Sequence, residues 1–329
     1  MSQFVLGVDE NGLGPRLGPL LVTAVALEAA SGAERAATRK PSAALAARLG
    51  DSKALVKYGG SSLGEAWARA IAARLGRPVP TDPDALLRGF LLDGDAVLRA
   101  RCPADHERQC WGVEDERFTS DDDAVAQAER DLARLEKRGL TVRAVRVAIV
   151  CTERLNDAAR RGVSRFQVDL HAMERLVLAL RAELGADVTA ICGKVGGYDR
   201  YGDAFGPLGG RLHVALAEGR ERSEYRFPGV GTLAFVRDAD DSHLVVSLAS
   251  LVGKWARDML MYRIVRYHRE THPDLPDASG YHDPVTAKFV AATALTRKAR
   301  ALPDTCFERE KAATGRPSPE TGRAAGPIT

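Results

Sequence analysis

Aromatic residues, cysteines and long apolar runs are all scarce in this chain of 329 residues, and each scarcity excludes a class of protein. Phe, Trp and Tyr together make up 6% of the chain, too few for a binding surface built mainly on base stacking. No run of eighteen apolar residues occurs, so we expect no membrane span. Five cysteines without regular spacing exclude a disulfide scaffold and predict a reducing, cytoplasmic location.

A strong excess of one charge is also missing. Lys and Arg number 47 against 44 Asp and Glu, for a formal net charge of +3, which allows nucleic acid as a partner without requiring it. With 45% apolar and 28% charged residues, the composition is typical of a globular protein with a sizeable core. Asp9 and Glu10 directly follow the first short apolar stretch, which excludes a secretory signal.

Short apolar strands and longer helical patterns alternate along the chain. Apolar runs predict strands at residues 4–8, 20–27, 142–150, 188–192 and 232–236. The first two strands should form an antiparallel hairpin, because a glycine-rich loop joins them. Helical spacing predicts helices at residues 43–49, 62–75, 166–184, 245–267 and 285–296. Strands in both halves with helices between them predict an α/β domain with a mixed sheet.

We predict a single domain over residues 1–310 that carries two insertions. The first, at about 77–140, contains three prolines and an acidic cluster and should pack as a lid or small subdomain. The second, at about 193–229, is rich in glycine and should form an elaborated hairpin. Residues 311–329 consist largely of Pro, Gly, Ala and Thr, a composition typical of a disordered tail.

Two adjacent carboxylates, Asp9 and Glu10, close the first predicted strand. Neighbouring strand residues point to opposite faces, so both side chains can serve one site only if the strand ends between them. The Asn11-Gly12 turn signal predicts such an end. Two carboxylates beside a glycine-rich loop suit a hard divalent cation with open positions for phosphate oxygens. The alternative is a solvated acidic strand end next to a tight turn.

Four motifs follow one another in a fixed order. Residues 9–15 (Asp-Glu-Asn-Gly-Leu-Gly-Pro) come first and residues 51–53 (Asp-Ser-Lys) second. The third spans residues 249–258 and includes Ala-Ser, Lys254 and Arg-Asp, and the fourth is Gly280-Tyr281. Together they resemble the motifs of ribonuclease HII, the type 2 ribonuclease H family, and the resemblance covers roughly residues 4–75, 142–194 and 230–297.

The resemblance implies a ribonuclease H-like fold, in which helices flank a central mixed β-sheet. It also implies a metal-dependent endonuclease that cleaves RNA in RNA–DNA hybrids, or at a single ribonucleotide in duplex DNA. The implied cofactor is Mg²⁺ or Mn²⁺, held by carboxylates that match Asp9, Glu10 and Asp258 here. The implied substrate-binding residues are Gly12, Leu13, Gly14, Ser52, Lys53, Lys254 and Tyr281, with Lys53 on phosphate and Tyr281 on the sugar at the junction.

The chain departs from the family pattern at the third catalytic aspartate. In the segment that should hold Asp-Gly-Asn, Cys192 stands for the aspartate and Lys194 for the asparagine. A thiol is a poor ligand for Mg²⁺, which prefers oxygen. We expect the ammonium of Lys194 to sit where metal charge would otherwise be, favouring one metal or none. Asp199 lies close enough along the chain to be a substitute ligand.

Two further departures concern substrate contacts. Leu13 occupies the position of the loop arginine in the family, so the charged phosphate contact of that arginine is missing. The downstream histidine of the family falls at about Thr286, and His282 is either its substitute or a surface loop residue.

Two further readings stay open. One is a ribonuclease H-fold protein that binds hybrid or duplex nucleic acid but has lost efficient cleavage. The other is an unrelated α/β protein whose motifs match by chance.

Overall fold

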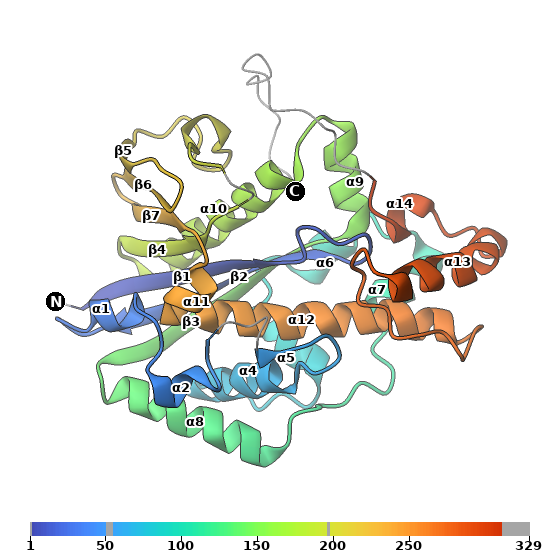
Figure 1. Cartoon of the computed structure of the whole chain (residues 1–329), viewed down its shortest axis with the longest axis horizontal. Coiled ribbons are helices and arrows are strands. Elements are labelled where there is room, and N and C mark those ends of the chain that lie inside the picture. Colours follow the sequence, from blue (N-terminus) through green and yellow to red (C-terminus); the bar gives the residue numbers. More distant parts are fainter. Residues whose placement is uncertain (1, 51–54, 196–197, 311–329) are drawn as a thin grey trace.

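The computed structural model describes residues 2–50, 55–195 and 198–310 (Figure 1). The predicted phosphate-binding residues Ser52 and Lys53 and the predicted tail therefore lie outside the described residues. In the described ranges, no helix is long and apolar enough to cross a membrane.

A mixed sheet of seven strands forms the centre of the described chain, in the order β3-β2-β1-β4-β7-β6-β5 (Figure 1). β1 pairs antiparallel with β2, as the sequence predicts, and parallel with β4, which in turn pairs parallel with β7. The remaining pairs are antiparallel. The strands are β1 (Gln3–Asn11), β2 (Leu20–Ala29), β3 (Leu140–Val150), β4 (Val188–Gly193), β5 (Val214–Ala217), β6 (Arg222–Phe227) and β7 (Gly231–Val236).

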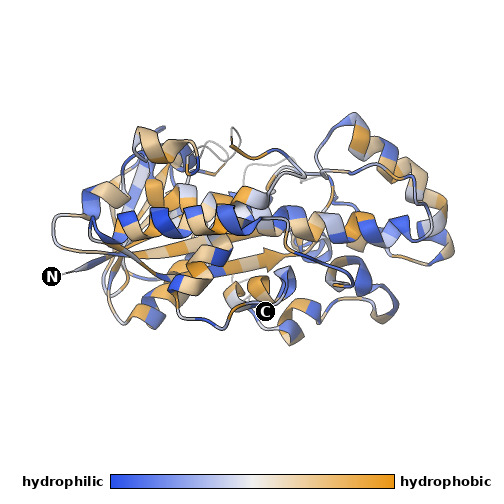
Figure 2. Ribbon diagram, turned by 90° about the horizontal axis from the view of Figure 1, so that it is seen from below, coloured by the Kyte–Doolittle hydropathy of each residue, from blue (hydrophilic) through white to orange (hydrophobic). Residues whose placement is uncertain are grey.

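Helices cover both faces of this sheet. The long helix α12 (Leu244–Arg269) packs on one face against β1 and β2, and α10 (Arg165–Leu184) packs on the other (Figure 1). Most strand residues are hydrophobic, whereas the outer sides of the helices are hydrophilic (Figure 2). The α/β class with a central mixed sheet flanked by helices is therefore confirmed.

Further helices extend these two layers. α4 (Ser62–Arg74) packs against α12, and α8 (Asp122–Glu136) packs against α4. The others are α1 (Glu34–Ala37), α2 (Ala43–Ala46), α5 (Pro83–Phe90), α6 (Asp95–Arg99), η1 (Ala104–His106), α7 (Arg108–Trp111), α9 (Thr152–Arg160), η2 (Gly202–Ala204), α11 (Ala239–Ser242), α13 (Pro284–Ala299) and α14 (Asp304–Phe307).

The pleat of β1 decides which side chains face which helix. Val5 belongs to the core under α12, whereas Leu6 and Val8 belong to the core under α10. Gly7 faces α12 at a point where an added Cβ would collide with the backbone of Val245, so only glycine allows this close approach. The same alternation puts Asp9 on the α12 side of the sheet.

Residues 77–140 are not a separate lid. Their apolar side chains, including Phe90, Trp111 and Leu132, belong to the same core cluster as Trp255 of α12. The buried Glu65 of α4 fastens this segment to the rest of the core. Its carboxylate accepts hydrogen bonds from the amides of Thr119 and Ser120, both at 2.7 Å, and from Trp255 Nε1 at 3.2 Å.

The second predicted insertion extends the sheet. β5 and β6 form an antiparallel hairpin, and β6 pairs with β7. Residues 214–227 therefore form a hairpin at the edge of the sheet.

Replacing Glu65 with alanine should destabilise the protein by about 3 kcal/mol, because buried amide and indole donors would lose their acceptor. Urea unfolding measures this loss. The matched control is Glu136→Ala, which removes a partly exposed carboxylate paired with Arg74 at 2.9 Å and should cost less than about 1 kcal/mol. Equal losses in the two variants would contradict a structural role for Glu65.

Candidate active site at the carboxyl ends of β1 and β4

A cavity of about 650 Å³ opens where β1 and β4 part. The two strands pair in parallel only as far as Val8 and Cys192. Beyond this point the chain leaves β1 for β2 on one side, while β4 continues to pair with β7 on the other. In open α/β sheets, ligands bind outside the carboxyl ends of parallel strands at such a switch point. The topology therefore marks this cavity as the candidate site.

Asp9 and Glu10 meet at the mouth of this opening. β1 continues through both residues to Asn11, so the strand does not end between them as the sequence predicts. They come together because both lie beyond the last residue pair of β1 with β4. A Cβ on Gly193 would lie 3.0 Å from Asp9 Oδ1 and 3.1 Å from Glu10 Oε2. Both carboxylates therefore border one small space that the missing side chain of Gly193 leaves open.

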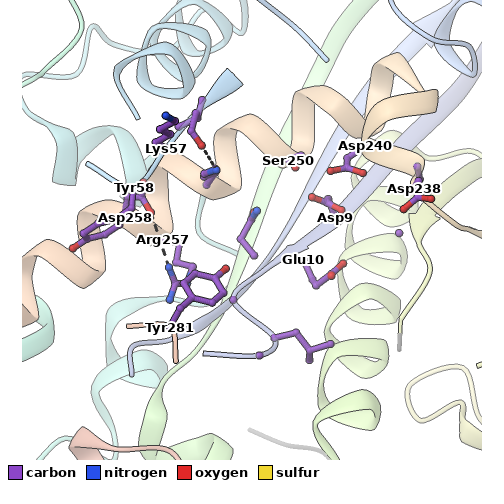
Figure 3. Close-up of a pocket in the computed structure, with 18 of the residues that line it drawn as sticks. Asp9, Glu10, Lys57, Tyr58, Asp238, Asp240, Ser250, Arg257, Asp258 and Tyr281 are labelled. Carbon is purple, nitrogen blue, oxygen red and sulfur yellow. Dashed lines mark hydrogen bonds and ion pairs between the residues drawn. The ribbon is translucent and has the colours of Figure 1, made fainter. Parts of the chain in front are cut away.

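Asp240 of α11 also lies at this wall, and the sequence analysis missed it. Figure 3 shows its carboxylate next to that of Asp9, with Asp238 on the same side of the cavity. Ser247 Oγ donates to the Asp240 backbone oxygen at 2.7 Å and so fixes the corner between α11 and α12. The sequence signal was available, because an acidic cluster directly follows β7, the parallel neighbour of β4.

Asp258, the third predicted ligand, lies across the cavity with Tyr58 and Arg257 (Figure 3). Its side chain is 7% exposed, and its Oδ1 lies 4.0 Å from Arg257 Nη1. Among the described residues, its Oδ2 has no hydrogen-bond partner. Burial raises the pKa of Asp258 to about 6, although Arg257 and Lys254 act in the opposite direction. The structure thus separates Asp258 from the pair formed by Asp9 and Glu10.

Cations and an aromatic ring line the wall around Asp258. Lys57, Lys254 and Arg257 all border the cavity, and Lys254 Nζ donates to the Val56 carbonyl. The Arg257 guanidinium lies 4.8 Å from the centre of the half-exposed Tyr281 ring. This cationic wall faces the carboxylates and suits a ligand that carries phosphate and sugar.

Several predicted substrate residues therefore share one cavity. Lys254 and Tyr281 belong to the cationic wall, and the glycine loop contributes Gly12, Leu13 and Gly14. His282 is exposed and does not line the cavity, whereas Thr286 is buried and accepts a hydrogen bond from the Gly280 amide at 3.2 Å.

Cys192 does not face the cavity. Its side chain is fully buried in the core under α10, because successive residues of β4 point to opposite faces. Burial is the largest cause of a raised thiol pKa, and Asp169 adds to it. The residue of β4 that faces Asp9 and Glu10 is Gly193, one position later than the resemblance suggests.

Lys194 lines the same cavity as Asp9 and Glu10, but its ammonium contacts other groups. Its Nζ donates to the Gly219 carbonyl and to Ser223 Oγ, and it lies 3.2 Å from Asp199 Oδ1. The hairpin of β5 and β6 therefore holds the ammonium. The carboxylate of Asp199 is engaged with Lys194, which argues against its use as a substitute ligand.

A further buried acid, Asp169 of α10, lies within electrostatic range of Asp9. Asp169 is fully buried, and neither of its carboxylate oxygens has a hydrogen-bond partner among the described residues. Burial, and to a lesser degree the charge of Asp9, raises its pKa well above the usual range. A raised pKa favours the protonated form of Asp169, which carries no negative charge.

Two carboxylates that border one space can hold a divalent cation with open coordination positions. Mg²⁺ commonly uses one or two carboxylates, completed by water and substrate phosphate. Within the described part of the chain, no group of three or more His, Cys, Asp or Glu side chains is arranged to hold a metal ion. Asp9 and Glu10 could therefore supply two of the ligands of such a cation.

No protein-family model matches the chain, and no curated protein matches it. Among solved structures, it is similar to ribonuclease HII of Archaeoglobus fulgidus in complex with PCNA, with 14% identity and a TM-score of 0.42 over 96% of this chain and 98% of that chain. Ribonuclease H2 of Pyrococcus horikoshii OT3 gives 15% identity and a TM-score of 0.40 over 93% and 92%. Bst ribonuclease HIII in complex with Mn²⁺ gives 15% identity and a TM-score of 0.42, and the match covers 93% of this chain and 66% of that chain. Likeness at this level does not assign an activity to this chain.

Replacing Asp258 with asparagine should stabilise the metal-free protein at pH 8 but not at pH 4. Between about pH 4 and pH 6 the folded protein keeps a proton on Asp258 that the unfolded chain releases, so the free energy of unfolding falls as pH rises through this window. The loss amounts to about 3 kcal/mol for two pKa units and persists above pH 6. Asparagine stays neutral and avoids it.

Urea unfolding in a chelator at pH 4 and pH 8 measures the difference. Asp123→Asn, at an exposed position on α8, is the control and should show no such pH-dependent gain. A gain for Asp258→Asn that is equal at both pH values would contradict a raised pKa.

Proposed function

We propose that this protein is a metal-dependent nuclease of the ribonuclease H type that cleaves RNA in RNA–DNA hybrids, or at ribonucleotides in duplex DNA. One observation carries the proposal. Asp9 Oδ1 and Glu10 Oε2 converge on the open space at Gly193, in a cavity whose opposite wall is cationic. Carboxylates on one side and phosphate-binding groups on the other are what phosphodiester hydrolysis requires.

The proposed cofactor is Mg²⁺ or Mn²⁺, held by Asp9 and Glu10 with Asp240 beside them. A divalent ion there would supply Lewis-acid stabilisation of the charge that develops on the phosphate. Both side chains offer carboxylate oxygens, the ligand atoms that Mg²⁺ and Mn²⁺ prefer, which supports a metal role for the pair.

The cationic wall would hold the nucleic acid. Lys57 and Lys254 are positioned to bind backbone phosphates, and Arg257 steadies the Tyr281 ring for contact with a sugar. A partner of this chemistry is an RNA–DNA hybrid or a duplex that contains ribonucleotides. We also propose a cytoplasmic location, which the five free cysteines support.

Cleavage should depend most on Asp9 and Asp240. Asp9→Asn should abolish detectable cleavage of a labelled hybrid in Mg²⁺ or Mn²⁺, because Asp9 is a proposed metal ligand. Asp240→Asn should lower the rate by about a hundredfold or more, because its carboxylate lies beside that of Asp9. Asp258→Asn should lower it by less than about tenfold, because Asp258 stands on the opposite wall. A loss of cleavage in Asp258→Asn as large as that in Asp9→Asn would show that Asp258 is also a metal ligand.

The alternative function is a ribonuclease H-fold protein that binds hybrid or duplex nucleic acid and cleaves it poorly. The specific observation in its favour is Gly193, which leaves the position between Asp9 and Glu10 without a carboxylate. Leu13 also lacks the phosphate contact that the resemblance implies for an arginine. Under this alternative, binding would persist in a chelator and weaken with salt.

Gly193→Asp should separate the two functions. The new Cβ would contact only the ends of the Asp9 and Glu10 side chains, which can shift by a few tenths of an ångström. The third carboxylate should tighten Mn²⁺ binding by about tenfold, measured by titration calorimetry, and should accelerate cleavage if the parent is impaired.

The matched control is Cys192→Asp. It should not tighten Mn²⁺ binding, because its carboxylate would be buried under α10 near Asp169. Tighter Mn²⁺ binding by Cys192→Asp alone would refute the assignment of Gly193. No Mn²⁺ binding by the parent or by Gly193→Asp would favour the binding protein.

A further inference from the structure

The C-terminal arm, defined as residues 304–310, lies against the glycine loop of residues 12–18. Leu17 and Glu308 form an isolated antiparallel bridge, and the Arg309 amide donates to the Arg16 carbonyl at 2.9 Å. Asn156 of α9 secures the arm from the other side, with Nδ2 donating to the carbonyl of Glu308 at 2.9 Å. Two segments that are far apart in the sequence therefore lie side by side near the cavity.

The side chain of Arg309 extends from this arm to the glycine loop. Nε donates to the Gly18 carbonyl at 2.8 Å, and Nη1 donates to the carbonyls of Gly12 and Leu13 at 2.7 and 3.2 Å. Arg309 is only 5% exposed, and its Nη2 has no hydrogen-bond partner in the described ranges. No ion pair joins it to a carboxylate among these residues, so three carbonyls hold a buried cation.

The orientation of these carbonyls determines where the loop amides point. No cis peptide bond occurs among the described residues, and in a trans peptide unit the carbonyl and the next N–H point in opposite directions. The carbonyls of Gly12 and Leu13 point inward to Arg309. The N–H groups of Leu13 and Gly14 therefore point outward, from residues that line the cavity. Neither N–H donates to a backbone acceptor among the described residues.

Outward-pointing amides backed by a cation make an anion-binding surface. Successive backbone N–H groups in a turn bind phosphate oxygens without any charged side chain at the contact. Open space surrounds Gly14, where an added Cβ would meet no atom within 4 Å. Gly12 has a φ of 93°, a conformation that favours glycine and lets the loop turn its carbonyls inward.

We propose that Arg309 is the positioning residue of the glycine loop, turning the amides of Leu13 and Gly14 toward a substrate phosphate and adding its own positive potential to that position. This rests on the proposed nucleic-acid function. The guanidinium of Arg309 would supply the positive charge that the resemblance implies for an arginine at position 13. The Leu13 side chain is free to pack against the apolar clusters beneath the loop.

Titration of the full-length, ¹⁵N-labelled protein with inorganic phosphate tests the orientation of the amides. In the parent protein the resonances of Leu13 and Gly14 should shift on addition of phosphate. Arg309→Met should lose this response, and its affinity for a short RNA–DNA hybrid in a chelator should fall about tenfold, with a salt slope lower by about one. Arg309→Lys keeps the charge but reaches fewer carbonyls, so it should keep the slope and lose part of the response.

Arg165→Met is the matched control, because Arg165 donates to the Glu310 carbonyl at 2.8 Å and touches the arm without reaching the loop. It should keep both the amide response and the affinity within about twofold of the parent. A parental response in Arg309→Met, or an equal loss in Arg165→Met, would overturn the inference, as would a parent without any response. If Arg309→Met fails to fold, Arg309→Lys takes its place. A response of its Leu13 and Gly14 amides as large as that of the parent would then overturn the inference.

Failure of the proposed function gives a different result. The amides could respond to phosphate in a protein that cleaves no hybrid in Mg²⁺ or Mn²⁺. That result would support the role of Arg309 and contradict the proposed nuclease function.

Discussion

The early end of the parallel pairing between β1 and β4 is the constraint on which the site depends. Backbone pairing stops at Val8 and Cys192, although both strands continue. Beyond that point β1 pairs only with β2 and β4 only with β7, and two carboxylates of opposite pleat border the same space at Gly193. The close packing of α12 on β1 is possible because position 7 is glycine.

The distribution of charge around this opening is uneven. Negative groups gather at the ends of β1 and β7, while the cations Lys57, Lys254 and Arg257 stand opposite them. Lys194, the residue after Gly193, donates its hydrogen bonds to the β5–β6 hairpin. The carboxylates and the cationic wall therefore lie on different sides of the cavity. The proposed function uses this separation, with a metal ion on the acidic side and substrate phosphates on the cationic side.

Much of the fold follows from local sequence patterns. The predicted strands are present as β1, β2, β3, β4 and β7, and the long helices as α4, α10, α12 and α13, because strong apolar periodicity is a local property. The structure of residues 77–140 was harder to predict, because its short helices are stabilised by packing on α4 and α12 rather than by an apolar periodicity of their own. Sequence periodicity does not reveal which distant surface an insertion will cover.

The site was predictable only in part, for equally physical reasons. Motif spacing placed Asp9, Glu10, Lys254 and Tyr281 around one cavity, but it could not give the register of β4 against β1. A shift of one residue exchanges the two faces of a strand, so Cys192 was mistaken for the residue that faces the carboxylates. Arg309 lay beyond reach, because nothing local links position 309 to a loop at position 12.

The contact between the two ends of the chain has a consequence for how the protein comes into being. During synthesis the N-terminal strands emerge first, yet β1 needs β4 on one side and its loop needs Arg309 beneath it. Contacts of such long sequence separation form slowly, because the intervening chain must be ordered before they are gained. The contacts beneath the glycine loop are thus completed only after residues 304–310 have been synthesised and packed.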